Sequence, residues 1–155
     1  MKTRKIDTIA ADDGKYLFQN YGRLPACFIR GEGSYLFDQD NRRYVDFFAG
    51  IAVSSLGHGN SALTRAIHAQ ADRLLHSSNW FFSREQNEAA RHISELAFPG
   101  KTLFTNSGTE ANEGAIKLAR LFGKATSPER YHIIAFTGSF HGRTFGAMSA
   151  TGQEK

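Results

Sequence analysis

The chain has 155 residues, of which 41% are hydrophobic and 22% are charged. This composition is that of an ordinary globular protein, and the length is sufficient for one domain with a hydrophobic core. We expect no membrane partner, because no apolar run reaches the length of a membrane span and residues 1–7 lack the apolar core of a signal peptide. Cys27 is the only cysteine, which excludes an intrachain disulfide and fits a reducing compartment.

The net charge of +4 raises the alternative that the chain binds nucleic acid. Such a protein would lose affinity steeply as the salt concentration rises. The basic residues are scattered, however, and only Arg42–Arg43 and residues 1–5 approach a cluster. Because no basic face carries interleaved aromatic side chains, we expect no nucleic-acid partner and only a mild attraction for anionic metabolites.

The first part of the chain is predicted to be irregular and then β-structured. From Met1 to about Pro25 the pattern has no regular period, and Asp12-Asp13-Gly14 is typical of a turn. Residues 28–48 predict a β-hairpin whose strands are separated by the turn-forming cluster Asp38-Gln39-Asp40-Asn41.

Two helices are predicted next. Asn60 is placed to cap a helix that runs to about Leu75, with apolar residues along one face. Ser83 and Gln86 form the S-x-x-Q pattern of a capping box for a second helix, which runs to about Phe98. Pro99-Gly100 ends it.

A strand, a helix and another strand are predicted to follow. Residues 101–105 and 131–136 are short apolar runs that predict buried strands. Between them, apolar residues recur at helical spacing from Glu110 to Phe122, and Gly123 stands where a helix usually ends. This βαβ order predicts an α/β fold with a parallel sheet and functional groups at the strand ends.

The turn before that helix is the strongest candidate for a binding site. Ser107, Gly108 and Thr109 are small residues at a helix start, where unpaired backbone N–H groups and the positive end of the helix dipole favour an anion. The dipole contributes only about 0.3–1 kcal/mol for a surface charge. Taken alone, the pattern is more typical of a capped helix, with Ser107 and Glu110 as a capping box.

Four segments, in order along the chain, resemble the class-III aminotransferases, which use pyridoxal 5′-phosphate (PLP). The resemblance runs from about Phe28 to Lys155 and is closest to the acetylornithine aminotransferase branch. The segments are the hairpin of residues 31–47, Phe48-Ala49-Gly50-Ile51-Ala52-Val53 with Leu56-Gly57-His58-Gly59, Asn106-Ser107-Gly108-Thr109-Glu110-Ala111-Asn112-Glu113 with residues 116–120, and Ser139-Phe140-His141-Gly142-Arg143-Thr144 with residues 149–152.

The resemblance implies the N-terminal part of a PLP-dependent transferase of fold type I, the aspartate aminotransferase-like fold. Residues 1–57 would form an N-terminal segment with a β-hairpin, and residues 58–155 would begin the large, parallel-sheet PLP-binding domain. It also implies a cytoplasmic homodimer whose substrates are amino acids and 2-oxo acids.

The resemblance assigns roles to individual residues. Ser107, Gly108 and Thr109 would hold the cofactor phosphate, and Phe140 would stack on the cofactor ring, which adds about 0.5–1.5 kcal/mol beyond burial. His141 would lie at the cofactor in a structural hydrogen bond. The residues expected on the substrate side are Arg143, as the clamp for the α-carboxylate, and Asn79 and Ile51. No metal site is expected, because no two histidines stand three or four residues apart.

In the family, the Schiff-base lysine and the aspartate that pairs with the pyridine nitrogen follow these segments. None of Lys101, Lys117 and Lys124 matches the lysine motif, so we expect the Schiff-base lysine to lie beyond Lys155 and the chain alone to be inactive. The parent protein would transfer the δ-amino group of N-acetylornithine to 2-oxoglutarate.

Two kinds of alternative stay open besides that activity. Aminotransferases for ornithine, succinylornithine or 4-aminobutyrate share most of these segments. From another class of function, the chain is a non-catalytic fragment that binds a phosphorylated ligand or a partner chain.

Overall fold

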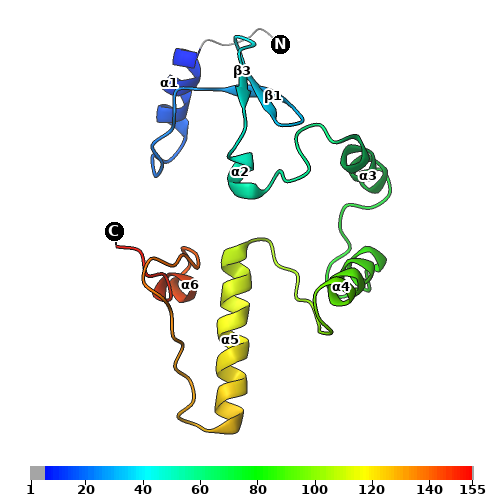
Figure 1. Cartoon of the computed structure of the whole chain (residues 1–155), viewed down its shortest axis with the longest axis vertical. Helices are drawn as coiled ribbons and strands as arrows, with labels where there is room; N and C mark the ends of the chain where they lie inside the picture. Colours follow the sequence, from blue (N-terminus) through cyan, green and yellow to red (C-terminus); the bar gives the residue numbers. More distant parts are fainter. Residues whose placement is uncertain (1–5, 155) are drawn as a thin grey trace. The chain divides into compact units, whose positions relative to one another are not determined.

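A computed structural model describes residues 6–154 of the chain (Figure 1). The chain divides into two units, residues 1–80 and residues 81–155, which are described separately below. The domain boundary expected after Gly57 concerns the longer protein and stays a prediction.

The first unit begins with helix α1, Ile6–Tyr16, in a region predicted to be irregular. That prediction is wrong for residues 6–16, whereas residues 17–25 are irregular as predicted; residues 1–5 lie outside the described part. Asp7 in the first turn and Lys15 in the last turn match the helix dipole. Asp13 also accepts a hydrogen bond from the side-chain amide of Gln19 and pairs with Arg23 at 3.1 Å. These contacts offset the weak helix propensity of aspartate and glycine that favoured a turn.

The predicted hairpin is confirmed as part of a three-stranded antiparallel sheet with the order β1-β2-β3. The strands are β1 Phe28–Glu32, β2 Tyr35–Asp38 and β3 Arg43–Val45. Asp38 accepts hydrogen bonds from the amides of Asp40 and Arg42 and from the Tyr44 hydroxyl. Burial works to raise the pKa of Asp38, but these hydrogen bonds outweigh it and lower the pKa. The carboxylate therefore fixes the predicted turn that joins β2 to β3.

The two predicted caps are confirmed. Asn60 Oδ1 accepts from the amides of Ala62 and Leu63 at the start of α3, Ser61–Ala71. In the second unit, Ser83 Oγ accepts from the Gln86 amide at the start of α4, Arg84–Leu96. Both helices end a few residues earlier than the apolar pattern predicted; at α3 the Gln70 side chain donates to the carbonyl of Leu74 instead.

The second unit also contains α5, Gly108–Thr126, and α6, Phe145–Ser149, which pack together. Gly123 does not end α5, as predicted from sequence, but lies inside it and is buried. The carbonyl oxygen of Arg130 occupies the place of a side chain at this position. The glycine therefore permits a close backbone approach rather than a helix end.

The predicted strands at residues 101–105 and 131–136 are not strands in the structure, although the first segment precedes α5 and the second follows it in the sequence, as predicted. Every strand pair within residues 6–154 is antiparallel and belongs to the first unit. A parallel strand is defined by ladder hydrogen bonds to a partner that is distant in sequence. The described residues supply no such partner, so these apolar segments stay unpaired.

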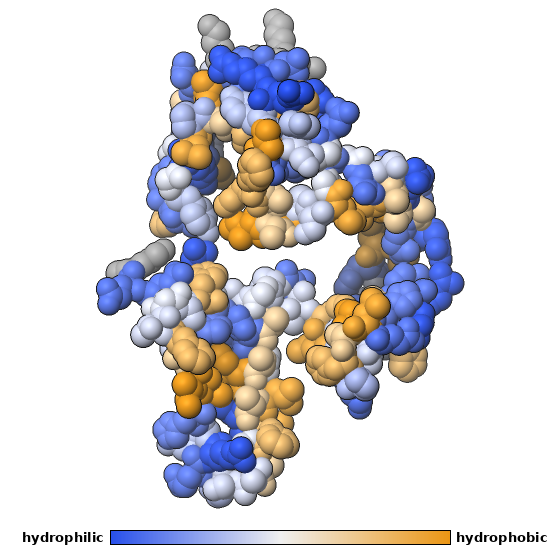
Figure 2. Space-filling view, viewed as in Figure 1, coloured by the Kyte–Doolittle hydropathy of each residue, from blue (hydrophilic) through white to orange (hydrophobic). Residues whose placement is uncertain are grey.

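Apolar side chains cover much of the surface of both units (Figure 2). Phe47, Phe82 and Phe145 are each more than 90% exposed, and Ala147 is the one apolar side chain classed as buried among the described residues. Monomeric proteins rarely expose apolar surface on this scale. The described residues therefore leave most of their apolar faces uncovered.

Candidate functional site

The start of α5 forms the predicted capped turn, with one difference. Ser107 Oγ accepts a hydrogen bond from the Glu110 amide at 3.2 Å, as a capping box requires. The return bond goes one residue further back, because the Glu110 carboxylate accepts from the backbone and side-chain amides of Asn106. The turn is thus fixed from both sides.

Gly108 and Thr109 provide the free donors of this turn. Within residues 6–154 their backbone amides donate to no protein acceptor. No atom lies within 4 Å of where a side chain at Gly108 would begin, and its backbone is not in the left-handed region. Neither packing nor conformation therefore requires a glycine here. A ligand that must approach the backbone closely supplies the missing reason, and a phosphate fits it.

The loop of residues 137–144 lies against this end of α5. Gly142, with φ of 134°, lies so close to the Thr109 side chain that any Cβ would collide with it. The side-chain amide of Asn112 donates to the His141 carbonyl at 2.6 Å, and the His141 amide donates to Thr151 Oγ1 at 3.0 Å. The structure therefore brings together two predicted site segments that are about thirty residues apart.

Phe140 and Arg143 lie next to each other on this loop. Phe140 is half-exposed. The guanidinium carbon of Arg143 lies 5.1 Å from the centre of the Phe140 ring, within the range of a cation–π contact. The side chains expected to meet a cofactor ring and a substrate carboxylate thus share one surface.

Glu113 is the main residue of this region that sequence reasoning missed as a site element. Its carboxylate accepts hydrogen bonds from the Thr144 hydroxyl and from the Ala147 amide at 3.0 Å. The Thr144 bond is the largest of the interactions that lower the pKa of Glu113. These partners are more than thirty residues away, so no local sequence signal indicated the contact.

Ile51 lies in the first unit, on an unusual turn. Ala49, Gly50, Ile51 and Ala52, which form α2, all have φ between 46° and 64°, the left-handed region. Each non-glycine residue there costs roughly 1–2 kcal/mol. Ile51 is 76% exposed. Strain of this kind clusters at functional sites, which agrees with the substrate-side role predicted for Ile51.

The left-handed turn is held by Asp46. Its Oδ1 accepts from the amides of Phe48 and Ala49, and its Oδ2 lies 2.7 Å from His58 Nε2. The His58 bond is the main cause of the lowered pKa of Asp46. His58 is itself fixed, because its backbone pairs with that of Gly33.

Asn79 follows Ser78 in the break after α3, also in the first unit. Ser78 has φ of 68°, so the chain turns sharply there. The roles of Asn79 and Ile51 toward the substrate stay predictions.

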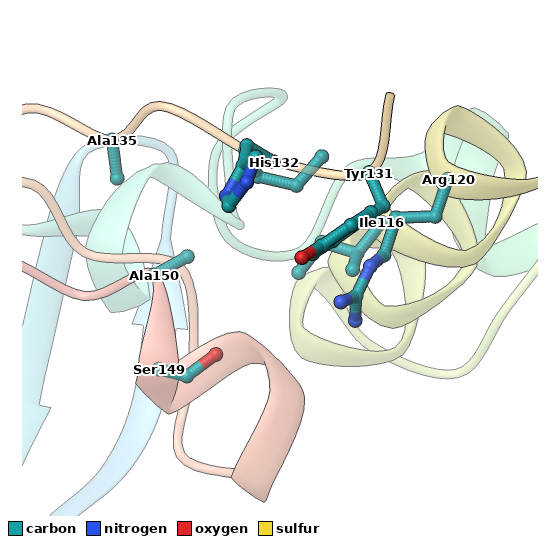
Figure 3. A pocket seen from close by; sticks show the side chains of 8 residues that line it. Ile116, Arg120, Tyr131, His132, Ala135, Ser149 and Ala150 are labelled. Atoms are coloured by element: carbon teal, nitrogen blue, oxygen red, sulfur yellow. The ribbon is translucent and has the colours of Figure 1, made fainter. Parts of the chain in front are cut away.

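A hollow of about 220 Å³ lies beside the middle of α5 (Figure 3). Figure 3 shows Arg120 of α5 and Tyr131 pointing into it, with His132 next to them and Ser149 and Ala150 opposite. Arg120 stands three turns beyond Gly108, about 18 Å along the helix axis. Gly108 and Thr109 are not among the residues that line this hollow.

Comparison with known proteins decides the family. The model of the family Aminotransferase class-III matches residues 16–155. The chain belongs to the class-III aminotransferases. Aminotransferases of this class use PLP, which is the cofactor expected from the sequence.

Curated relatives of this class-III chain are named acetylornithine aminotransferase. The protein from Caldanaerobacter subterraneus subsp. tengcongensis is 54% identical over 142 residues, which cover 91% of the chain and 36% of the relative. The protein from Aquifex aeolicus is 47% identical over 141 residues, which cover 90% and 38%. The chain thus spans little more than a third of the length of these relatives.

Solved structures agree with the family. The ornithine aminotransferase from Toxoplasma gondii ME49 matches with a TM-score of 0.91 and 30% identity, over 98% of the chain and 37% of that structure. The acetylornithine aminotransferase from Elizabethkingia anophelis matches with a TM-score of 0.75 and 31% identity, over 79% and 32%. Another Toxoplasma gondii structure, with a TM-score of 0.85 and 28% identity over 98% and 36%, shows partial occupancy of PLP at the active site. These matches confirm the predicted fold class, a part of a fold type I transferase.

None of the helices in residues 6–154 combines the length and apolar character needed to cross a bilayer. Within the same range no three or more histidine, cysteine, aspartate or glutamate side chains gather as metal ligands would.

Proposed function

We propose that this chain is the cofactor-holding part of an acetylornithine aminotransferase. Such an enzyme transfers the δ-amino group of N-acetylornithine to 2-oxoglutarate. The observation that carries the proposal is a contact between the start of α5 and the loop of residues 137–144, called the aromatic loop below. In this contact Thr109 lies against Gly142, and Asn112 donates to the His141 carbonyl. Identities of 47–54% to relatives of that name support the choice of substrate.

The residues at the start of α5 fit the phosphate of PLP. The amides of Gly108 and Thr109 donate to it from the positive end of the helix dipole. Ser107 Oγ accepts from the Glu110 amide, which leaves the hydroxyl proton to donate to the ligand. The open space at Gly108 lets the phosphate reach the backbone.

The loop of residues 137–144 serves the rest of the site. Phe140 covers one face of the cofactor ring and keeps water from it, and His141 holds the loop in register through its backbone. Bound PLP supplies an electron-accepting ring that stabilises the charge left on carbon when a proton departs. Arg143 binds the substrate carboxylate, to which its planar guanidinium is suited.

The complete enzyme, in our proposal, is longer than this chain and contains the lysine that moves the proton. The chain alone is then inactive. A cytoplasmic homodimer is part of the same proposal, supported by the single, free cysteine and by the exposed apolar faces.

A matched pair of glycine substitutions tests the proposed phosphate site in the complete enzyme. Gly108→Val places a branched side chain in the open space at the first residue of α5, and we expect PLP affinity to fall about tenfold or more, or about 1.4 kcal/mol. Gly14→Val is the control, because Gly14 in α1 also has nothing within 4 Å of its Cβ position and an ordinary φ. Equal PLP affinity in both variants contradicts the proposal.

The substrate is tested with a panel. Purified complete enzyme with PLP and 2-oxoglutarate is given N-acetylornithine, N-succinylornithine, ornithine or 4-aminobutyrate, and glutamate formation is measured. We expect the highest kcat/KM for N-acetylornithine. A higher value for another donor reassigns the substrate but leaves the phosphate site intact.

A further inference from the structure

Helix α6 lacks a cap of its own. The side chain of its N-cap residue, Thr144, accepts no hydrogen bond from the helix. The Thr144 hydroxyl donates instead to the Glu113 carboxylate on the neighbouring helix α5, which also accepts from the Ala147 amide at 3.0 Å. Glu113 therefore caps α6 from outside, with its negative charge at the positive end of that helix.

Gly146 and Ala147 of α6 pack closely against this carboxylate. The Glu113 carboxylate occupies the place that a side chain at Gly146 would take, so the glycine leaves room for the contact. Ala147, whose amide Glu113 holds, is fully buried. The bond to the Ala147 amide is thus part of the packing of α5 on α6, whereas the bond to the Thr144 hydroxyl lies at the surface.

The start of α6 is also the end of the aromatic loop. Thr144 directly follows Arg143, and Phe140 lies four residues before it. At its other end the loop is attached to the chain after α6, since the Gly138 amide donates to Gly152 and the His141 amide to Thr151. A shift of α6 therefore moves both ends of the loop.

We infer that Glu113 is a positioning residue that fixes the aromatic loop, and with it Phe140 and Arg143, relative to the phosphate-binding turn of α5. What the loop does rests on the proposed function; the attachment itself does not. Glu113 stands one and a half turns from Gly108 on the same helix, so the phosphate site and the loop share one rigid support.

The attachment is tested without cofactor, by amide hydrogen exchange on the complete enzyme. In Glu113→Ala we expect the amide of Ala147 and those of residues 140–146 to exchange about tenfold faster, the factor expected for a lost hydrogen bond of ordinary strength. Glu113→Gln, which keeps an acceptor oxygen, is expected to show a smaller effect. Glu95→Ala is the control, because the Glu95 carboxylate pairs with Arg91 on α4 and with no other side chain that the structure describes.

Exchange rates in residues 140–147 that stay within twofold of wild type in Glu113→Ala overturn the inference. The same holds if Glu95→Ala accelerates them equally. Should Glu113→Ala fail to fold, Glu113→Gln decides in its place, and unchanged rates in that variant count against the attachment.

Kinetics separate a positioning role from a merely structural one. Because the phosphate turn is left intact, PLP affinity of Glu113→Gln is expected within about threefold of wild type, whereas KM for the amino donor rises about tenfold through the displaced Arg143. If PLP affinity falls by the same factor by which KM rises, the positioning role is overturned. If wild-type enzyme binds no PLP, the proposed function fails while the exchange experiment still decides the attachment.

Discussion

Asp46 in the first unit and Glu113 in the second do the same work in different surroundings. Each carboxylate accepts from backbone amides at the start of the next element and from one side chain, His58 for Asp46 and Thr144 for Glu113. In each case that side chain is the main cause of a lowered pKa. The partners of Asp46, however, lie within 12 residues of it, whereas those of Glu113 lie 31 and 34 residues away.

The first site, around Asp46, and the second site, around Glu113, also differ in which atoms can move. His58 is held at its backbone, by hydrogen bonds with Gly33 in both directions. The Glu113 carboxylate is the far end of a flexible side chain. An added side chain near His58 should therefore lower the free energy of unfolding strongly. An added side chain near Glu113 should lower it little and should instead displace the Glu113 carboxylate.

The largest effect is expected from Gly31→Ala, which crowds the first site. A Cβ at Gly31 would lie 2.5 Å from Cβ and Cγ of His58, atoms that cannot move far because the His58 backbone is paired. Overpacking of this kind costs about 1–3 kcal/mol. We expect the free energy of opening of the β1–β2 pair, measured by amide hydrogen exchange, to fall by that amount.

Gly22→Ala is the control for Gly31→Ala, because the space around Gly22 is open. A loss below about 0.5 kcal/mol in Gly31→Ala, no larger than a typical surface substitution, would show that His58 is not held as described.

Gly146→Ala is the matching change at the second site, with a smaller expected effect on stability. The new methyl displaces only the Glu113 carboxylate, so we expect the thermal midpoint of the enzyme to change by less than about 2–4 °C, as for a loss of under 1 kcal/mol. Amide exchange at Ala147 should still rise, as in Glu113→Gln. A large loss of stability with no local change in exchange would mean that the two sites do not differ in this way.

The sequence was sufficient where the partners are local. The caps by Asn60, Ser83 and Ser107 join groups two or three residues apart, and the Asp38 turn joins neighbouring strands. Such contacts are set by short-range geometry, so the residue pattern predicts them.

Sequence reasoning was insufficient where the structure depends on contacts with residues that are distant in the sequence. Gly123 has the spacing of a helix end, but the Arg130 carbonyl makes it an interior residue of α5. Residues 131–136 have the composition of a strand, but composition does not supply a ladder partner. The Glu113 contact was missed for the same reason. The resemblance to the family did find the residues of the aromatic loop, without predicting what holds them.

The smallest expected effect is in acid. A lowered pKa means that the folded state favours the ionised carboxylate, so this stabilisation is present above the unfolded pKa, about 3.9 for aspartate and 4.3 for glutamate, and is lost as pH falls through the folded value. We expect carbon-13 NMR titration of the side-chain carboxyls to give midpoints for Glu113 and Asp46 that lie below those of the same residue types in the unfolded chain.

Two variants then sharpen the comparison. Thr144→Val removes the main cause of the lowered pKa of Glu113, so its midpoint should rise while that of Asp46 stays in place. His58→Ala should do the reverse, because His58 is the main cause at Asp46. If either variant moved both midpoints, the two carboxylates would be coupled through the rest of the enzyme. The description of Asp46 and Glu113 as independent hydrogen-bond acceptors in separate units would then be wrong.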